Sequence, residues 1–290
     1  MRVVLVTNIR TKKGLYQDAV LLSILLRRMG HEVKLADFRD RRIPSSDLVI
    51  QLEVVRRQFF SRGAEHWWIP NPEWVLERYL VGTSQFDRVL CKTPDAVRVM
   101  SPYSERVIHT GFMSEDRLRP EVAREPVFFH AFKGSREKGT VAIQVAWNGL
   151  TQPIVLAYDL TDEEIVQQQN RCQFHLCPSK YEGWGHTIHE ALSVGAIVVT
   201  TDMPPMNEFA GIPYHIQPVK YGELHLARTG YVNASGVRRA VRWCLGLSEA
   251  QIAEYSEAAR MAYEQETLSF RQVFGDLVTD VEQRRQNANH

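Results

Sequence analysis

Residues 172–201 read CQFHLCPSKYEGWGHTIHEALSVGAIVVTT, and this stretch decides the fold. The apolar run at its start predicts a buried strand, which Pro178 and the residue after it end. A glycine turn follows, and residues 187–194 then continue as a helix that Gly195 closes. Residues 196–201 begin the next strand. This order of strand, glycine turn, helix and strand is typical of a parallel α/β sheet.

Two glutamates, Glu182 and Glu190, stand eight positions apart in this unit. A helix that begins after the turn exposes unpaired N–H groups and the positive end of its dipole, which suit a phosphate. Glu182 in the turn is then expected near whatever the phosphate carries. Glu190 lies about two helical turns further on, where a carboxylate can accept hydrogen bonds from a ribose diol.

A zinc site is an alternative interpretation of His186 and His189. The zinc helix H-E-x-x-H places its histidines at i and i+4, whereas these two stand at i and i+3 with Glu190 after the second. We therefore expect no metal site here and interpret His189 as a packed or solvent-facing helix residue. A doubly wound α/β unit with an ordinary glycine turn is the other alternative.

The stretch resembles the E-x7-E motif of retaining glycosyltransferases with the GT-B fold, and glycosyltransferase family 4 in particular. Residues 179–185 are similar to S-x-x-E-G-F-G, with Trp184 in place of Phe. Residues 190–199 are similar to E-A-M-A-x-G-x-P-V-V, with Ile197 in place of Pro. The resemblance is specific over about residues 172 to 209 and implies a retaining enzyme that uses a nucleotide diphosphate sugar.

The resemblance also implies which residues bind the donor. The turn from Phe132 to Gly139 resembles G-R-L-x-x-x-K-G, so Lys133 and Lys138 are expected to neutralise the leaving diphosphate, although a charged surface turn is the simpler alternative. The residues expected to bind the donor are Gly14, Lys133, Lys138, Gly183, Trp184, Gly185, His186, Thr187 and Glu190. The residues expected to be catalytic are Glu182, Lys133, Lys138 and His109.

His109 is included because the family often places a histidine of the first domain near the sugar. His66 and His130 are further candidates for contact with donor or acceptor, although a lone histidine is more often structural. No D-x-D pair stands beside a strand end, which fits a mechanism without metal. We expect neither a metal nor another cofactor.

The 290 residues, 44% hydrophobic and 24% charged, suit an ordinary globular protein with two domains. Alternating strands and helices predict an α/β protein of the GT-B class, with two Rossmann-like domains that face each other across a crevice. The first domain is expected over residues 1–120, the nucleotide-sugar domain over 127–265, and residues 117–126, with two prolines, form the linker. Residues 266–290 are expected to be a helix that crosses back to the first domain, with a disordered tail.

The chain begins with a strand, lacks a secretory pattern and contains no run of about 18 apolar residues. No transmembrane segment is therefore expected. Its four cysteines form no C-x-x-C pattern, and buried reduced thiols are the default for such residues. These observations predict a cytoplasmic protein.

The charge is uneven along the chain. Residues 1–125 contain 21 Lys and Arg against 16 Asp and Glu, whereas the remainder contains 14 against 18. The basic half suits an anionic partner, either DNA or an anionic lipid surface, but scatter or a solvated face is an equally simple explanation. The residues expected to contact the acceptor are Arg56, Arg57, His66 and Trp67.

The sequence thus predicts a metal-independent, retaining glycosyltransferase, of hexosyltransferase type, that moves a sugar from a nucleotide diphosphate sugar to a hydroxyl. One alternative is a glycosyltransferase that acts on a hydroxylated base in DNA. A second is a catalytically inactive module that binds a sugar nucleotide or a nucleic acid.

Overall fold

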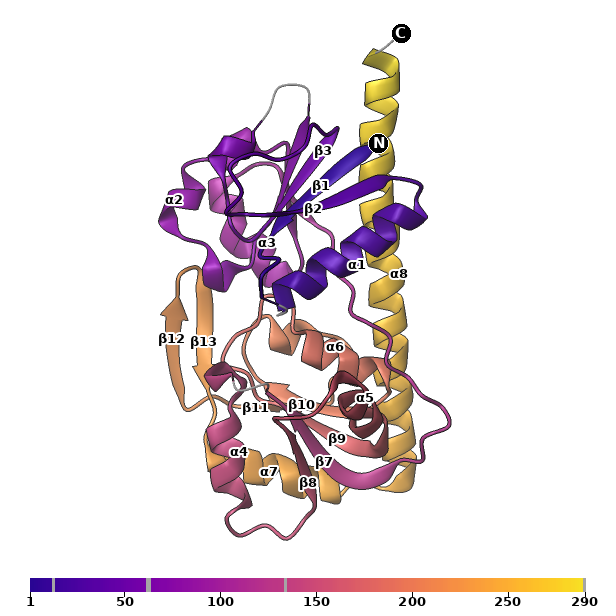
Figure 1. Ribbon diagram of the computed structural model, residues 1–290. Coiled ribbons are helices and arrows are strands. Elements are labelled where there is room, and N and C mark those ends of the chain that lie inside the picture. Colours follow the sequence, from indigo (N-terminus) through magenta and orange to yellow (C-terminus); the bar gives the residue numbers. More distant parts are fainter. Residues whose placement is uncertain (12–13, 61–63, 133–134, 289–290) are drawn as a thin grey trace. The chain divides into compact units, whose positions relative to one another are not determined.

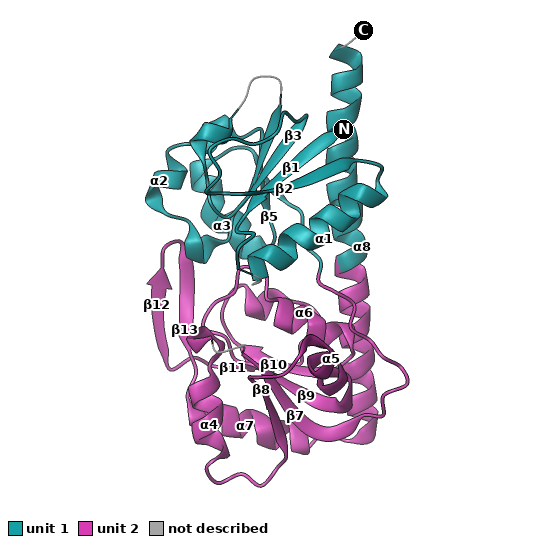
Figure 2. Ribbon diagram, in the orientation of Figure 1, with its two compact units in different colours: residues 1–113, 267–290 teal, residues 114–266 magenta. Residues whose placement is uncertain are grey.

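The structure is a computed structural model that describes the whole chain except residues 12–13, 61–63, 133–134 and 289–290. The chain divides into two compact units (Figure 2). Unit 1 consists of residues 1–113 and 267–290, and unit 2 of residues 114–266. Each unit is built on a parallel sheet, so the expected pair of Rossmann-like domains is confirmed.

Unit 1 contains a 6-stranded parallel sheet in the order β2-β1-β3-β4-β5-β6 (Figure 1). Its strands are β1 (Arg2–Thr7), β2 (Glu32–Asp37), β3 (Leu48–Leu52), β4 (Glu65–Ile69), β5 (Arg88–Cys91) and β6 (Val107–His109). Its helices are α1 (Gly14–Arg28), α2 (Glu77–Leu80), α3 (Pro94–Met100) and the last part of α8 (Glu249–Ala288). All residues of β3 are buried, as expected for a central strand covered on both faces.

Unit 2 contains a 5-stranded sheet in the order β11-β10-β9-β7-β8 and a separate hairpin. The sheet consists of β7 (Glu125–Ala131), β8 (Ile154–Ala157), β9 (Cys172–Cys177), β10 (Ile197–Thr201) and β11 (Tyr214–Ile216). The hairpin consists of β12 (Lys220–Leu224) and β13 (Ala227–Tyr231). The helices are α4 (Thr140–Trp147), α5 (Asp162–Arg171), α6 (His186–Ser193), α7 (Ala234–Leu245) and the first part of α8.

The core of unit 2 places aromatic strand residues beneath two helices. Phe128 of β7 stacks on Phe174 of β9 with ring centroids 4.9 Å apart. Ile143 of α4 and Val237 of α7 pack in the same cluster, so these helices cover one face of the sheet. Ile165 of α5 packs on residues of the opposite face. Both faces of the sheet are therefore buried, and the loops that follow its strands are left to form a functional site.

Two expectations about chain organisation are wrong. The segment expected as a linker, residues 117–126, belongs to unit 2, and its Arg117 side chain is only 5% exposed. The helix expected to begin at residue 266 is the last part of the 40-residue helix α8, which begins at Glu249. No proline or glycine stands near residue 266, so nothing in the local sequence interrupts helical hydrogen bonding there.

The cysteines are buried and unpaired, as expected. Cys91 lies in β5 of unit 1, whereas Cys172, Cys177 and Cys244 lie in unit 2. Burial raises the pKa of each thiol to about 12, so all four remain protonated at neutral pH. Among the helices of the described residues, none combines the length and the apolar character that a membrane span requires.

Candidate active site

Two loops of unit 2 meet at the carboxyl ends of β7 and β9. The backbone N–H of Lys180 donates to the carbonyl of Glu137 at 2.8 Å. Gly139 has a φ of +72°, and a Cβ atom there would lie 2.2 Å from the carbonyl oxygen of Pro178. Only glycine fits this close approach, so the two loops form one rigid surface.

A lysine and a glutamate face each other on this surface. Lys138 Nζ donates to Glu182 Oε1, and Ser179 Oγ donates to the same oxygen at 2.6 Å. The Lys138 side chain is 22% exposed and the Glu182 side chain 10% exposed. The structure therefore brings together two residues that stand 44 positions apart and were both expected to be catalytic. The second Glu182 oxygen and the ammonium group remain available to a ligand, because each has further hydrogen-bonding capacity.

Helix α6 begins directly after this loop. Gly185, its N-cap, has a φ of +83°, which glycine adopts without strain. The first N–H groups of a helix lack intrahelical partners, so the N-terminus of α6 can receive an anion. Ser114 Oγ fixes the entry to the helix, since it lies 2.8 Å from His186 Nδ1 and accepts a hydrogen bond from Trp184 Nε1 at 3.1 Å.

Trp184 and His189 are packing residues of this loop and helix. Their rings stack with centroids 3.8 Å apart, and Phe209 meets the His189 ring edge-on at 4.5 Å. His189 is 1% exposed, and its Nε2 lies 3.0 Å from Glu266 Oε2. The ring is thus enclosed by aromatic contacts. Of the two interpretations of His189, a packed or a solvent-facing residue, the structure agrees with the first.

Glu190 lies on α6 and is only 6% exposed. Its Oε2 accepts a hydrogen bond from Gln169 Nε2 at 3.2 Å, and its Oε1 lies 3.4 Å from Arg117 Nη2. Burial acts to lower the pKa of Arg117, but Glu190 and other acids outweigh it and the net shift is upward. The Arg117 guanidinium is therefore charged, and its contact and that of Gln169 hold the Glu190 carboxyl group in one orientation.

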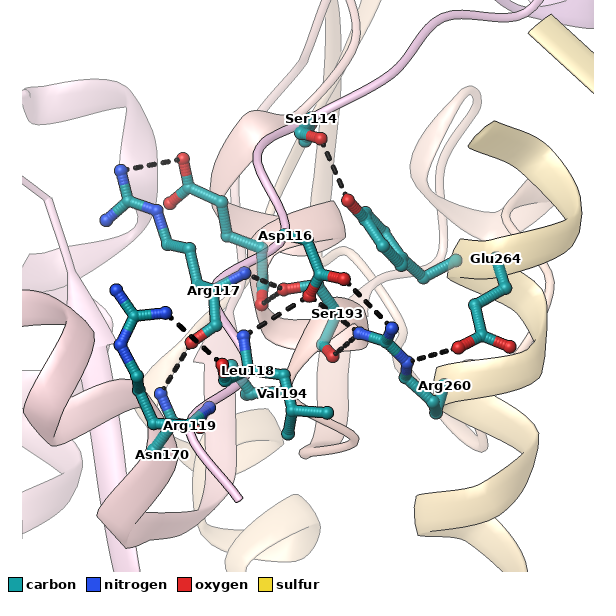
Figure 3. Close-up of polar contacts among 12 residues, drawn as sticks. Ser114, Asp116, Arg117, Leu118, Arg119, Asn170, Ser193, Val194, Arg260 and Glu264 are labelled. Atoms are coloured by element: carbon teal, nitrogen blue, oxygen red, sulfur yellow. Dashed lines mark hydrogen bonds and ion pairs between the residues drawn. The ribbon is translucent and has the colours of Figure 1, made fainter. Parts of the chain in front are cut away.

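The residues from Ser114 to Arg119 are tied to helix α8 and to α5 (Figure 3). Arg260 binds Asp116 through two hydrogen bonds of 2.7 and 2.9 Å. Asn170 of α5 holds the backbone of the same segment, because its Nδ2 donates to the Arg117 carbonyl and its Oδ1 accepts from Arg119 N, both at 2.7 Å. This network explains why the segment is ordered within unit 2 rather than a linker.

His130 lies beneath the loops as a structural residue. Its Nδ1 lies 2.7 Å from the Leu176 carbonyl, and its Nε2 lies 2.9 Å from Thr140 Oγ1. Burial lowers the pKa of His130 to about 4, with Lys138 acting in the same direction. The ring is therefore neutral at neutral pH, and both nitrogens are used in packing the turn.

The other expected site residues have different positions. Lys133 lies outside the described residues. Gly14 is the first residue of α1, and His109 ends β6 with an exposed side chain, both in unit 1. His66 is 4% exposed and Trp67 0%, and the indole of Trp67 donates to Glu65 Oε1 at 2.6 Å, so packing accounts for both residues. Arg56 and Arg57 line a surface cavity of unit 1, described below.

Sequence reasoning missed the residues that hold Glu190 and His186. Arg117, Gln169 and Ser114 come from other elements, and no motif contains them. For Arg117 the sequence even suggested a linker. Only the observation that a buried carboxylate requires a cationic or hydrogen-bonding partner could have prompted a search for them.

The family model described as "Glycosyl transferases group 1" matches residues 149–211, which include Glu182 and Glu190. Unit 2 therefore contains a region similar to this family. Two curated relatives match a 66-residue stretch, which is 23% of this chain and 17% of each relative. Both are GDP-mannose:cellobiosyl-diphosphopolyprenol alpha-mannosyltransferases, from Xanthomonas oryzae pv. oryzae at 32% identity and from Xanthomonas campestris at 30%.

Solved glycosyltransferase structures share the fold over nearly the whole chain. Sucrose-phosphate synthase from Thermosynechococcus elongatus has a TM-score of 0.74 at 11% identity, with 98% of this chain and 100% of that chain covered. Anabaena HepE in complex with UDP-glucose has a TM-score of 0.64 at 12% identity, with 97% and 100% covered. An alpha-glucosyltransferase in complex with UDP and a 13-mer DNA containing a HMU base has a TM-score of 0.63 at 12% identity, with 96% and 99% covered. At these identities the likeness shows the fold, which is that of GT-B glycosyltransferases.

Proposed function

We propose that the protein is a glycosyltransferase that moves a sugar from a nucleotide diphosphate sugar to an acceptor hydroxyl, with retention and without metal. The observation that carries the proposal is the contact between Lys138 and Glu182 beside the N-terminus of α6. A cation and the positive end of a helix dipole at one place suit a diphosphate whose negative charge grows as the bond to the sugar breaks. A carboxylate at the same place can receive a sugar hydroxyl.

In this mechanism Lys138 balances the charge of the leaving diphosphate, and Ser179 with Lys138 holds Glu182 in a fixed orientation. Glu190 is proposed to accept hydrogen bonds from the ribose, since a carboxylate has about four acceptor sites and Gln169 and Arg117 hold this one in a fixed orientation. Positioning before reaction lowers the barrier because little reorganisation is then needed at the transition state. Retention is supported by the resemblance to retaining enzymes.

The ribose contact can be tested by calorimetry with UDP, GDP, UDP-glucose and GDP-mannose, followed by the deoxyribose form of whichever nucleotide binds. We expect Glu190→Gln to weaken binding of the ribonucleotide by about 10- to 100-fold, since hydrogen bonds to a charged group contribute about 1.5–3 kcal/mol. The same substitution should have little effect on the deoxynucleotide. Equal losses for both nucleotides would show that Glu190 acts only through the fold. Glu163→Gln, on the exposed face of α5, is the matched control.

Metal independence is tested separately by donor hydrolysis and sugar transfer in excess chelator. Full turnover in chelator is expected because Lys138 and the N-terminus of α6 supply the positive charge. Loss of turnover in chelator with recovery on adding manganese or magnesium would refute this part of the proposal. Binding of a donor without any hydrolysis or transfer would favour an inactive binding module.

A further inference from the structure

A cavity of about 430 Å³ lies on unit 1, outside the site described above. Its residues come from the segments that follow the carboxyl ends of β2, β3 and β4. Three arginines and several apolar side chains line it, among them Arg56, Arg57, Arg78, Phe38, Val54 and Val81. This volume is within the range of small-molecule sites, about 300–1,000 Å³.

The three arginines have no acidic partner among the described residues. Arg56 donates from Nη2 to the neutral Gln58 at 3.2 Å, and its buried Nε has no hydrogen-bond partner. Elsewhere in unit 1, by contrast, Arg88 lies 3.2 Å from Glu65, and Arg39 lies 3.3 Å from Asp37. Uncompensated guanidinium groups around a cavity favour binding of an anion, and phosphate suits the guanidinium fork.

The most accessible apolar side chains of the cavity are aliphatic. Val81 is 74% exposed, and Val54 is half-buried. The aromatic rings are less accessible, because the Arg39 guanidinium lies over Phe38 at 4.3 Å and Tyr79 is only 7% exposed. Nucleic acids gain affinity from bases that stack on open aromatic faces, and such faces are scarce here. An aliphatic chain fits this surface better than a base.

We propose that this cavity binds the phosphate or diphosphate head of an amphipathic molecule, with its aliphatic chain against Val54 and Val81. The assignment of that molecule as the sugar acceptor rests on the proposed function. The binding itself does not, because every residue involved belongs to unit 1. The arginines hold the head, and the aliphatic chain covers Val81 and the accessible part of Val54 when the site is occupied.

The test uses the full chain and decyl phosphate at concentrations below micelle formation, with inorganic pyrophosphate and decyl maltoside as head-only and chain-only probes. We expect decyl phosphate to bind at least tenfold more tightly than either. Arg56→Gln and Arg78→Gln should each weaken it about tenfold, and the neutral substitution Val81→Ser should weaken it more than it weakens pyrophosphate. Higher salt should weaken binding to the wild type.

Arg28→Gln is the matched control, because Arg28 is an exposed arginine at the far end of α1. It should leave decyl phosphate binding unchanged. Equal affinity for decyl phosphate and decyl maltoside, or an unchanged affinity in Arg56→Gln, would overturn the proposal. Tighter binding of a single-stranded oligonucleotide than of decyl phosphate would also overturn it. Nucleotide-sugar binding, measured on the same variants, tests the proposed function independently.

Discussion

The carboxyl ends of the two sheets carry positive charge in different ways. In unit 2, Lys138 contacts Glu182, and Arg117 contacts Glu190, so each cation already has a carboxylate beside it. In unit 1, the three arginines of the surface cavity have no such partner among the described residues. The same type of sheet thus supports an internally compensated site in one unit and an uncompensated one in the other.

The difference indicates what each site is built to do. A compensated pair is held in a fixed geometry before a ligand arrives, which suits chemistry that depends on orientation. An uncompensated cluster attracts an anion over a longer range but fixes it less closely. Three predictions follow from this comparison, beginning with the largest expected effect.

Lys138→Gln removes the cation of the compensated site. We expect turnover of donor hydrolysis or transfer to fall by about 100-fold or more, because the charge on the diphosphate grows between the ground state and the transition state. The melting temperature should change less than the rate does, because Ser179 Oγ still donates to Glu182 Oε1 in the variant. Lys180→Gln is the matched control, because Lys180 lies on the adjoining loop and pairs with Glu137 at 3.1 Å. Similar rates for Lys138→Gln and the wild type would show that the pair is only a surface contact.

Gly139→Ala tests whether the compensated site depends on the close approach of its two loops. The added Cβ would overlap the Pro178 carbonyl in addition to the strain of a positive φ, so we expect a loss of at least about 2 kcal/mol in unfolding free energy. Gly30→Ala in unit 1 is the control: its φ is +89°, but no atom lies within 4 Å of the added Cβ. It should cost about 1 kcal/mol.

Amide hydrogen exchange shows which of the two units loses stability in each variant. Gly139→Ala should reduce the protection of amides in β7, whereas Gly30→Ala should affect β1. If both alanine substitutions had equal and small effects on stability, the loops of unit 2 would accommodate the added Cβ atom. The contrast between a fixed, compensated site in unit 2 and an uncompensated site in unit 1 would then be wrong.

The smallest expected effect is a dependence of the stability of unit 2 on pH, which results from His130. Its pKa is about 4 in the folded protein, below the ordinary value of 6.5. A depressed histidine pKa adds stability that is fully present above the unfolded pKa and is lost as pH falls toward the folded pKa. Between about pH 7.5 and pH 5 this loss is about 2 kcal/mol.

His130→Asn should flatten that part of the pH profile, since asparagine can still donate to the Leu176 carbonyl but does not titrate. The pH profile of stability is measured by urea unfolding, with amide exchange in β7 as the readout for unit 2. His175, whose pKa burial lowers to about 3, remains as the internal reference. An identical pH profile in wild type and variant would contradict the assignment of a neutral, structural His130.

The sequence supported the fold because the elements near residues 172–201 are encoded locally. Strand, glycine turn and helix each have their own pattern, and α5 likewise begins with a local signal, a Thr161 cap followed by three acidic residues. The contact of Lys138 with Glu182 was accessible only through a resemblance to known motifs, since no local pattern connects the two residues.

The remaining parts depend on distant residues. Arg117 meets Gln169 and Glu190, which stand 52 and 73 positions away, and only the sheet order brings them together. The prolines and charges around Arg117 suggested an exposed segment, yet buried partners hold it. The expected domain boundary at residue 265 suggests a helix boundary there too, whereas α8 continues through it from Glu249.

The distribution of the buried thiols has a practical consequence. One cysteine lies in unit 1 and three lie in unit 2, and each is protonated and nearly inaccessible in the folded chain. An alkylating reagent can therefore modify a given cysteine only in molecules whose surrounding unit has opened. Mass spectrometry of the peptides that contain Cys91 and Cys244 then follows the opening of each unit separately, without an engineered label. The chain thus contains its own reporters of which unit opens when conditions change.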